Sequence, residues 1–327
     1  MFPSHPIIAV VGAGAVGTYY GGRLAQHGAD VHFLLRSDYE AVSQRGWTVR
    51  SCNGDFVLPP DKTNVYRDAR KMPKADLVIV TLKATANDQY EPLIRPLLKG
   101  STAILTLQNG LGNEERLGEL FGPERVLGGL AFVCINRIEP GIVHHIDHGL
   151  VRMGEFQEQV TDRLRQIVAM FQRSKIHCEL VQSLRYARWE KLVWNVPFNG
   201  LGAACDLTTD ELIGTKDGEQ LVRAIMGEVV TAARAVGANL PAEVIDQKIA
   251  ATTTMGPYRS SMQVDRQGRR AMEVEAILGE PVRAAKRAGV AVPKLEMLYR
   301  LVGLVNQANE KAANNAEKLG LLNPHSP

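Results

Sequence analysis

Short apolar runs separated by amphipathic segments dominate the first half of the chain. Segments 17–27 and 88–98 have helical character and lie between such runs. Four runs have the length and continuous apolar character of strands buried on both faces of a parallel sheet: 7–11, 31–35, 75–82 and 102–107. Strands that alternate with helices predict a doubly wound α/β sheet with right-handed crossovers.

After the fourth apolar run, the apolar stretches become shorter and alternate more with polar residues. Residues 126–153 alternate in this way and predict extra strands at the edge of the sheet. A helix is expected over 161–173, with Thr161 as its N-cap and one apolar stripe. The apolar segment 176–181 would then close this domain.

From about Ser183 the apolar residues recur at helical spacing. The stretches with this spacing are 221–236, 244–254, 272–288 and 295–308. Pro281 is expected to kink or split the third of them. The last residues of the tail that follows Ala312 are expected to be frayed. The pattern therefore predicts an N-terminal doubly wound Rossmann domain over 1–182 and an all-α domain over 183–327.

The first apolar run leads directly into a glycine-rich loop. A buried strand that feeds a G-x-G-x-x-G turn and opens a helix is typical of a dinucleotide site. Gly12 allows the tight turn, Gly14 lets the backbone approach the pyrophosphate, and Gly17 lets helix and strand pack closely. The helix N-terminus offers N–H groups to the phosphates. The residues assigned to the cofactor are Gly12, Ala13, Gly14, Ala15, Val16 and Gly17.

Arg36 stands at the end of the second predicted strand, about 20 residues past the glycines. An NAD enzyme carries an acid there that binds the ribose hydroxyl, whereas an arginine matches a 2′-phosphate. The sequence therefore favours NADPH over NADH. An ordinary solvated arginine is the alternative, and the position at the strand end favours the cofactor interpretation.

Two loops follow the third and fourth strands, where cofactor and substrate are expected to meet in a crevice between the domains. Lys83 can place a positive charge near phosphates or an anionic substrate, and a solvated loop lysine fits the local sequence as well. Asn109 precedes Gly110 in a strong turn-forming pair and can offer its amide to substrate or nicotinamide.

The helical half opens with a segment that carries both polar and apolar faces. Lys191 and Asn195 are four residues apart and share one face of a helix, which Pro197 must kink or end. A lysine beside an apolar stripe is often a snorkelling surface residue. The sharper interpretation is a partly buried lysine whose pKa falls enough for proton transfer.

A pair of glutamates lies further along the chain. Of Glu273 and Glu275, one is expected to face the crevice while the other is solvated. From local sequence alone, an ordinary exposed helix glutamate is the default interpretation of Glu273.

Composition limits the remaining possibilities. The 327 residues allow two domains, and 45% hydrophobic with 22% charged residues is typical of a soluble globular protein. A net charge of +3 without a basic run argues against nucleic acid, and no apolar run is long enough for a membrane span. Four separated cysteines are expected to be reduced thiols in the cytoplasm.

Histidine and tryptophan residues form two further sets of candidate functional residues. His144, His145 and His148 form an H-H-x-x-H cluster in a strand-like segment, where no helix would put zinc ligands on one face. They are expected to be surface or edge-strand histidines, and no metal is expected. Trp47, Trp189 and Trp194 are interpreted as packing anchors.

These motifs together resemble the ketopantoate reductase (2-dehydropantoate 2-reductase) family along nearly the whole chain. The resemblance rests on the glycine loop, 35–36, 81–84, 108–110, 189–195, 260–262 with Asp265, Glu273 and 289–293. It implies hydride transfer from C4 of NADPH to the ketone carbon of a small 2-oxo acid in pantothenate biosynthesis. A homodimer is a further possibility.

The resemblance also implies a role for individual residues. Lys191 matches the catalytic lysine that protonates the alkoxide, and Glu273 matches the carboxylate that engages the substrate. Arg36 and Lys83 match the cofactor side, with Arg36 at the 2′-phosphate. The positions that line the substrate site are Asn109, Asn195, Asn199 and Ser261, and Asn109 is assigned to the cofactor as well.

Two departures keep alternatives open. The family commonly has Thr-Glu-Ile-Asp where this chain has 272–275, and several relatives carry asparagine where it has Tyr258. A bulkier or more apolar pocket would suit another branched or aromatic 2-oxo acid. A non-catalytic NADP sensor would need the glycine loop and Arg36, but neither Lys191 nor Glu273.

Overall fold

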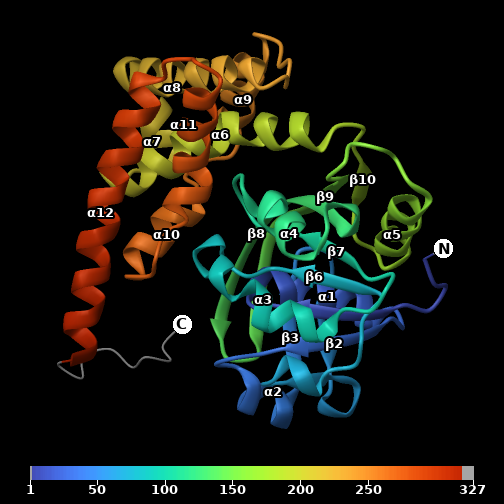
Figure 1. Cartoon of the computed structure of the whole chain (residues 1–327). Helices are drawn as coiled ribbons and strands as arrows, with labels where there is room; N and C mark the ends of the chain where they lie inside the picture. The colour runs from blue at the N-terminus through green and yellow to red at the C-terminus, as the bar shows by residue number, and fades with distance from the viewer. Residues whose placement is uncertain (1, 319–327) are drawn as a thin grey trace. The chain divides into compact units, whose positions relative to one another are not determined.

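The computed structural model describes residues 2–318 and divides into two units (Figure 1). The sheet unit holds residues up to 108 together with 113–184. The helical unit holds the rest from 185 onward together with the short loop 109–112, which leaves the sheet unit after its fourth central strand. A β-sheet unit followed by a helical one confirms the predicted fold class.

One mixed sheet organises the sheet unit, with the order β4-β3-β9-β8-β7-β6-β1-β2-β5 and β10 beside β9. Six strands, from β8 through β7, β6, β1 and β2 to β5, run parallel to one another. The strands are β1 Ile7–Val11, β2 Asp30–Leu34, β3 Trp47–Ser51, β4 Phe56–Leu58, β5 Asn64–Tyr66, β6 Leu77–Val80, β7 Ala103–Thr106, β8 Val126–Glu139, β9 Ile142–Glu155 and β10 Cys178–Leu180.

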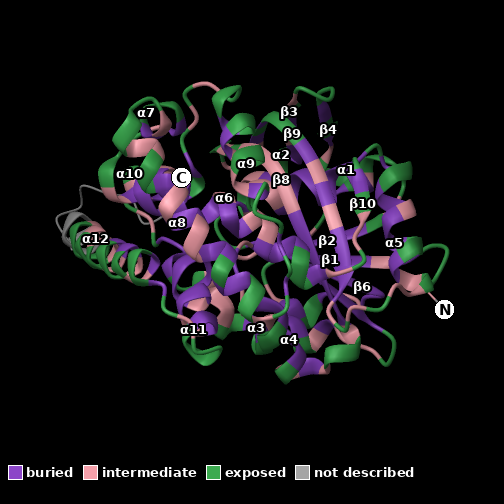
Figure 2. Ribbon diagram, turned by 90° about the horizontal axis from the view of Figure 1, so that it is seen from above, coloured by how far each residue is buried: buried purple, intermediate pink, exposed green. Residues whose placement is uncertain are grey.

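Alternate residues of the central strands enter two separate cores. In β1, Ile8 and Val10 belong to one apolar cluster, while Ala9 and Val11 belong to another on the opposite face. Strands buried on both faces explain why their sequences are continuously apolar. The helices of this unit are α1 Ala15–Gln26, α2 Tyr39–Arg45, α3 Tyr90–Ile94, α4 Asn113–Phe121 and α5 Asp162–Arg173. Figure 2 shows buried residues on the central strands and also on the helices.

The structure corrects two predictions about the sheet unit. The strands over 126–153 do not lie at the sheet edge: β8 and β9 form a long hairpin inside the sheet, and β3 and β4 lie beyond β9. The helix expected over 88–98 is broken into two short 3₁₀ turns around α3. Pro96 explains its end, because proline has no N–H and crowds the preceding turn.

The histidine cluster is only partly as predicted. His144 and His148 are exposed, but His145 is fully buried on an interior strand. Its ring lies 4.2 Å from that of Tyr19, and Ser51 Oγ is 2.9 Å from its Nδ1. The hairpin buries this residue because its pair of strands covers α1, which an edge position would not do.

The helical unit surrounds one apolar core in which the helices contribute one face each. The predicted helices are present, and the third one is split before Pro281, which lies in the first turn of α11. Its elements are α6 Leu184–Cys205, α7 Thr209–Ile213, α8 Lys216–Ala235, α9 Val244–Thr253, α10 Ser261–Gln267, a π-helix at Glu275–Gly279, α11 Glu280–Arg287 and α12 Pro293–Lys318. The frayed end was predicted for residues that mostly lie outside the described ones.

Helix α6 differs from its prediction in length. It continues through Pro197 to Cys205, so this proline does not end it. Pro197 and its neighbours Val196 and Phe198 are buried in the core of the helical unit, and that packing offsets the missing backbone hydrogen bond. The continuous helix places residues 191, 195 and 199 in one row.

Candidate active site

The glycine loop packs closely against the segment that follows β6. Gly12 has a positive φ of 91°, and a Cβ there would lie 2.6 Å from the backbone nitrogen of Leu82. A Cβ on Gly17 would collide with Thr81, whose hydroxyl donates to the Gly12 carbonyl at 2.7 Å. Both glycines are therefore required by close packing against the segment that follows β6.

The start of α1 is suited to an anion. Gly14 caps the helix without a side-chain hydrogen bond, and the first turn contains no acidic residue. A Cβ on Gly14 would meet only the Gly12 carbonyl, at 3.9 Å, so the space above the loop is open. Free N–H groups, the positive end of the helix dipole and an open approach fit the pyrophosphate of a dinucleotide.

Two predicted cofactor residues stand at carboxyl ends of strands in the sheet unit. Arg36 is exposed two residues after β2, and Ser37 beside it is exposed as well. Lys83 is exposed and precedes the 3₁₀ turn that follows β6. Their positions match the edge of a parallel sheet at which dinucleotides bind.

Lys191 lies in α6, within the helical unit, and its surroundings are unusual for a lysine. Its Nζ donates to Asn109 Oδ1 at 2.9 Å. Burial, together with the positive charge of Arg188, lowers the pKa of Lys191 from 10.5 to about 7, and Glu273 opposes this shift. An ammonium with such a pKa exchanges its proton near neutral pH.

The loop 109–112 is held in place by the helical unit. Leu111 N donates to the carbonyl of Ala276 at 2.9 Å. Gly110 has a φ of 85°, and a Cβ on it would lie 2.7 Å from the Ala276 Cβ. The π-helix widens the turn at Ala276, so its carbonyl can accept from outside the helix. Asn109 is thereby positioned for Lys191.

The two glutamates behave as expected for one inward and one outward residue. Glu273 is 9% exposed, and Glu275 is exposed and pairs with Arg283 at 2.8 Å. The default interpretation of Glu273 as an exposed helix residue was wrong, because it lies just before the π-helix and is buried.

The other residues predicted to bind the substrate lie along α6 beyond Lys191 and at the start of α10. Asn195 and Asn199 follow Lys191 at intervals of four along α6, and both are buried. Asn199 Oδ1 accepts from Ser261 Oγ and from Met262 N, each at 3.1 Å. The helical unit thus brings together Asn199 and Ser261, and separately Lys191, Asn109 and Glu273.

Arg188 is a contributor that sequence analysis did not assign. It is 4% exposed and precedes Lys191 by three residues, which puts the two cations on one helix face. That spacing was visible in the sequence, but the burial that gives the repulsion its strength was not.

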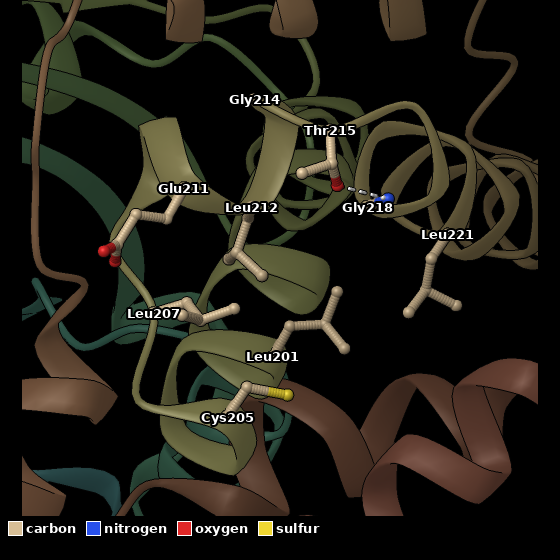
Figure 3. A pocket seen from close by; sticks show the side chains of 9 residues that line it. All are labelled: Leu201, Cys205, Leu207, Glu211, Leu212, Gly214, Thr215, Gly218 and Leu221. Carbon is tan, nitrogen blue, oxygen red and sulfur yellow. Dashed lines mark hydrogen bonds between the residues drawn. The ribbon is translucent and has the colours of Figure 1, made fainter.

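A pocket elsewhere in the helical unit does not coincide with these residues. It has a volume of about 530 Å³, lies among α6, α7 and α8, and is lined mainly by apolar residues such as Leu201, Leu212 and Leu221 (Figure 3). None of the predicted site residues lines it.

A glycine loop between β1 and α1 of the sheet unit, followed by a helical unit with a half-buried lysine, is typical of a nicotinamide-dependent oxidoreductase. A family model for ketopantoate reductase PanE/ApbA matches residues 8–158, and one for its C-terminal part matches 183–306. The chain belongs to the ketopantoate reductase family. It is an NADPH-dependent oxidoreductase that acts on a 2-oxo acid.

Individual relatives agree with this assignment. A 2-dehydropantoate 2-reductase of Nostoc sp. is 42% identical over 306 residues, which cover 92% of this chain and 95% of that protein. The crystal structure of 2-dehydropantoate 2-reductase from Geobacter metallireducens GS-15 has a TM-score of 0.89 at 47% identity, covering 91% of this chain and 99% of that one.

More distant structures share the fold alone. D-mandelate dehydrogenase, solved with NADH and anilino(oxo)acetate, has a TM-score of 0.84 at 23% identity and covers 92% of this chain and 99% of that one. Within residues 2–318, no helix is both long and apolar enough to cross a membrane.

Proposed function

We propose that this protein reduces 2-dehydropantoate to pantoate with NADPH, with Lys191 as the proton donor. The observation that carries the proposal is the half-buried Lys191, bonded to Asn109 and held at a pKa of about 7 by burial and Arg188. In this proposal the sheet unit binds the dinucleotide and the helical unit binds the 2-oxo acid. The family and its relatives at 42% and 47% identity support the choice of substrate.

Lys191 performs the acid step in this mechanism. When bound, NADPH supplies a hydride to the ketone carbon of the substrate. The ammonium of Lys191 then gives its proton to the alkoxide oxygen and is left as a neutral amine, which solvent protonates again. A pKa near 7 lets both forms exist at neutral pH, and Asn109 Oδ1 directs the Nζ by accepting one of its N–H groups.

Glu273 and the polar row of α6 orient the substrate. Glu273 stabilises the protonated form of Lys191, and we assign its carboxylate to a substrate hydroxyl. Because Asn199 Oδ1 is occupied by α10, its amide N–H₂ is the part that faces the substrate. Asn195 and the Ser261 hydroxyl are assigned to the substrate as well.

The cofactor residues act through charge and through backbone groups. The pyrophosphate is assigned to the loop from Gly12 to Gly17 and to the start of α1, because N–H groups there have no side-chain partner. Arg36 is assigned to the 2′-phosphate and Lys83 to the phosphates near the nicotinamide half. Asn109 reaches both cofactor and substrate in this arrangement.

One experiment tests the substrate directly. NADPH oxidation is followed by the loss of its absorbance with 2-dehydropantoate and with a panel of branched and aromatic 2-oxo acids. We expect the highest kcat/KM with 2-dehydropantoate. A higher value with an aromatic 2-oxo acid would favour the alternative, for which the half-buried rings of Trp194 and Tyr258, tilted with centroids 6.3 Å apart, offer an aromatic surface. Binding of NADPH without turnover of any member would indicate a sensor.

We propose further that the protein is a homodimer in the cytoplasm. Helix α12 exposes an apolar stripe in which Met297, Leu301 and Leu304 are 62%, 45% and 65% exposed. Such a stripe is typical of an interface. Light scattering should give twice the chain mass, and Leu304→Asp should give a monomer. A monomeric wild type would refute the dimer.

The cytoplasmic location is supported by the four cysteines, which are free thiols, as is usual in a reducing compartment. Cell fractionation tests this location.

A further inference from the structure

The end of β2 is tied to the far end of the β8–β9 hairpin. Arg137, near the end of β8, donates from Nη1 to Ser37 Oγ at 3.0 Å and to Asp38 Oδ1 at 2.5 Å. Gly141, in the turn of the same hairpin, donates its N–H to Asp38 Oδ2 at 3.2 Å. The hairpin therefore holds both oxygens of this carboxylate.

Asp38 is placed where an acid would change the choice of cofactor. It is two residues past Arg36, in the region where NAD enzymes bind the ribose hydroxyl with a carboxylate. A free carboxylate there would repel a 2′-phosphate. In this chain Asp38 is 3% exposed, and its charge is paired with Arg137. The charge of Asp38 is thus compensated by Arg137, and its carboxylate oxygens point towards the hairpin.

Arg137 retains donors of its own. A guanidinium carries five N–H groups, and the two on Nη1 are used by Ser37 and Asp38. The three on Nε and Nη2 have no acceptor among residues 2–318, and the side chain is 23% exposed. The Ser37 hydroxyl donates to Asp38 Oδ1 at 2.9 Å, so the groups available beside this loop are Arg36 and the remaining N–H groups of Arg137.

We propose that Arg137 is a second determinant of NADPH specificity. It withdraws Asp38 from the ribose and gives its remaining N–H groups to the 2′-phosphate. The inference rests on the proposed function, in which Arg36 and the end of β2 receive that phosphate. Its ligand class is a ribose 2′-phosphate monoester, which carries up to two negative charges and prefers paired guanidinium groups.

The test measures binding of the adenosine half alone, by isothermal titration with 2′,5′-ADP and with ADP. Removing Arg137 alone leaves a buried carboxylate unpaired, so Arg137→Gln risks unfolding. The comparison that avoids this is D38N against D38N/R137Q, in which no buried charge is left without its partner. We expect D38N/R137Q to bind 2′,5′-ADP about 10- to 100-fold more weakly than D38N, with ADP nearly unchanged.

The R137Q variant, where it folds, measures the second part of the proposal. We expect it to lose more affinity for 2′,5′-ADP than D38N/R137Q loses, because its Asp38 carboxylate is retained but no longer paired with Arg137. Arg45→Gln is the matched control, since Arg45 donates to Pro140 O at 3.3 Å in the same hairpin turn without touching Ser37 or Asp38. It should bind both ligands as the wild type does.

Several results would overturn the inference. One is an unchanged preference for 2′,5′-ADP in D38N/R137Q relative to D38N. Equal losses for both ligands, or the same loss in R45Q, would show that Arg137 only supports the hairpin. A wild type that binds ADP as tightly as 2′,5′-ADP would refute the proposed cofactor site together with Arg137. Because no 2-oxo acid is present, these results are independent of the substrate assignment.

Discussion

The glycine loop and the surroundings of Lys191 are two sites built on opposite principles. The loop offers backbone N–H groups, and its requirement is space: Gly12 and Gly17 are needed because any Cβ would collide with the 81–82 segment. Lys191 offers one side-chain proton, and it depends on the residues around it. Burial and Arg188 lower its pKa, and Asn109 accepts a hydrogen bond that orients its Nζ. The first kind of site can be predicted from residues that are close in sequence, whereas the second depends on tertiary packing.

The difference also decides how each site fails when a residue is changed. Backbone N–H groups cannot be removed by substitution, so a site made of them is disrupted only when the backbone shifts. Substitutions that introduce a steric clash therefore affect such a site most. A site made of one tuned side chain is lost with that side chain and can be retuned by its charged neighbours. Substitutions in the two sites therefore should differ in whether they affect turnover or cofactor binding.

Lys191→Ala should have the largest effect. Loss of a general acid typically costs 10²- to 10⁴-fold, so we expect kcat to fall at least about 100-fold. NADPH should bind with nearly its original Kd, because the glycine loop belongs to the other unit. Steady-state kinetics and fluorescence titration measure the two quantities.

Lys248→Ala is the matched control for this variant. Lys248 pairs with Glu190 at 2.8 Å and lies in the same unit, but it is not assigned to the site. It should keep kcat within about twofold, since this partly exposed ion pair, with each side chain 22% exposed, contributes little to stability. Near-normal turnover of Lys191→Ala would remove Lys191 from the acid role.

Gly17→Ala should have the opposite effect to Lys191→Ala, because it should weaken NADPH binding. Its Cβ would collide with Thr81 and lie 3.0 Å from the Gly12 carbonyl, so the loop must move. Overpacking of this kind costs roughly 1–3 kcal/mol, which corresponds to about 5- to 150-fold weaker NADPH binding when the strain raises the free energy of the bound state. Calorimetric titration measures the Kd.

Gly100→Ala serves as the control in the same unit, because a Cβ there meets nothing within 4 Å. It should leave the Kd for NADPH unchanged. If Gly17→Ala bound NADPH normally, the close contact between helix and strand would not be a requirement of the cofactor loop.

Much of the fold was predictable because its signals are local. The apolar run of β1, the loop after it and Arg36 at the end of β2 all appear within 30 residues. Strands β3 and β5 were missed because polar residues interrupt their apolar pattern, and β4 because it has only three residues. The place of β8 and β9 inside the sheet depends on pairing with β3, which is far away in sequence.

The site was predictable in its residue types but not in its physical state. Lys191 and Asn195 at a spacing of four indicated a shared helix face, and Glu273 against Glu275 indicated one inward residue. The bond from Lys191 to Asn109 joins residues 82 positions apart, and no spacing rule encodes it. The carbonyl of Ala276 became available only through a π-helix, which the sequence pattern does not signal.

The smallest effect is a shift in pH dependence, and it tests whether neighbours tune Lys191. Because reduction requires the ammonium, kcat should fall as pH rises through about 7. Arg188 lowers the pKa of Lys191, so Arg188→Gln should move this alkaline limb to higher pH. Glu273 raises the pKa, so Glu273→Gln should move the limb to lower pH, alongside a higher KM if the carboxylate binds substrate. Rate profiles between pH 5 and pH 10 with saturating NADPH, taken on the chemical step by single turnover, measure both. Shifts in the same direction, or an alkaline limb that ignores both substitutions, would assign the titration to a group other than Lys191.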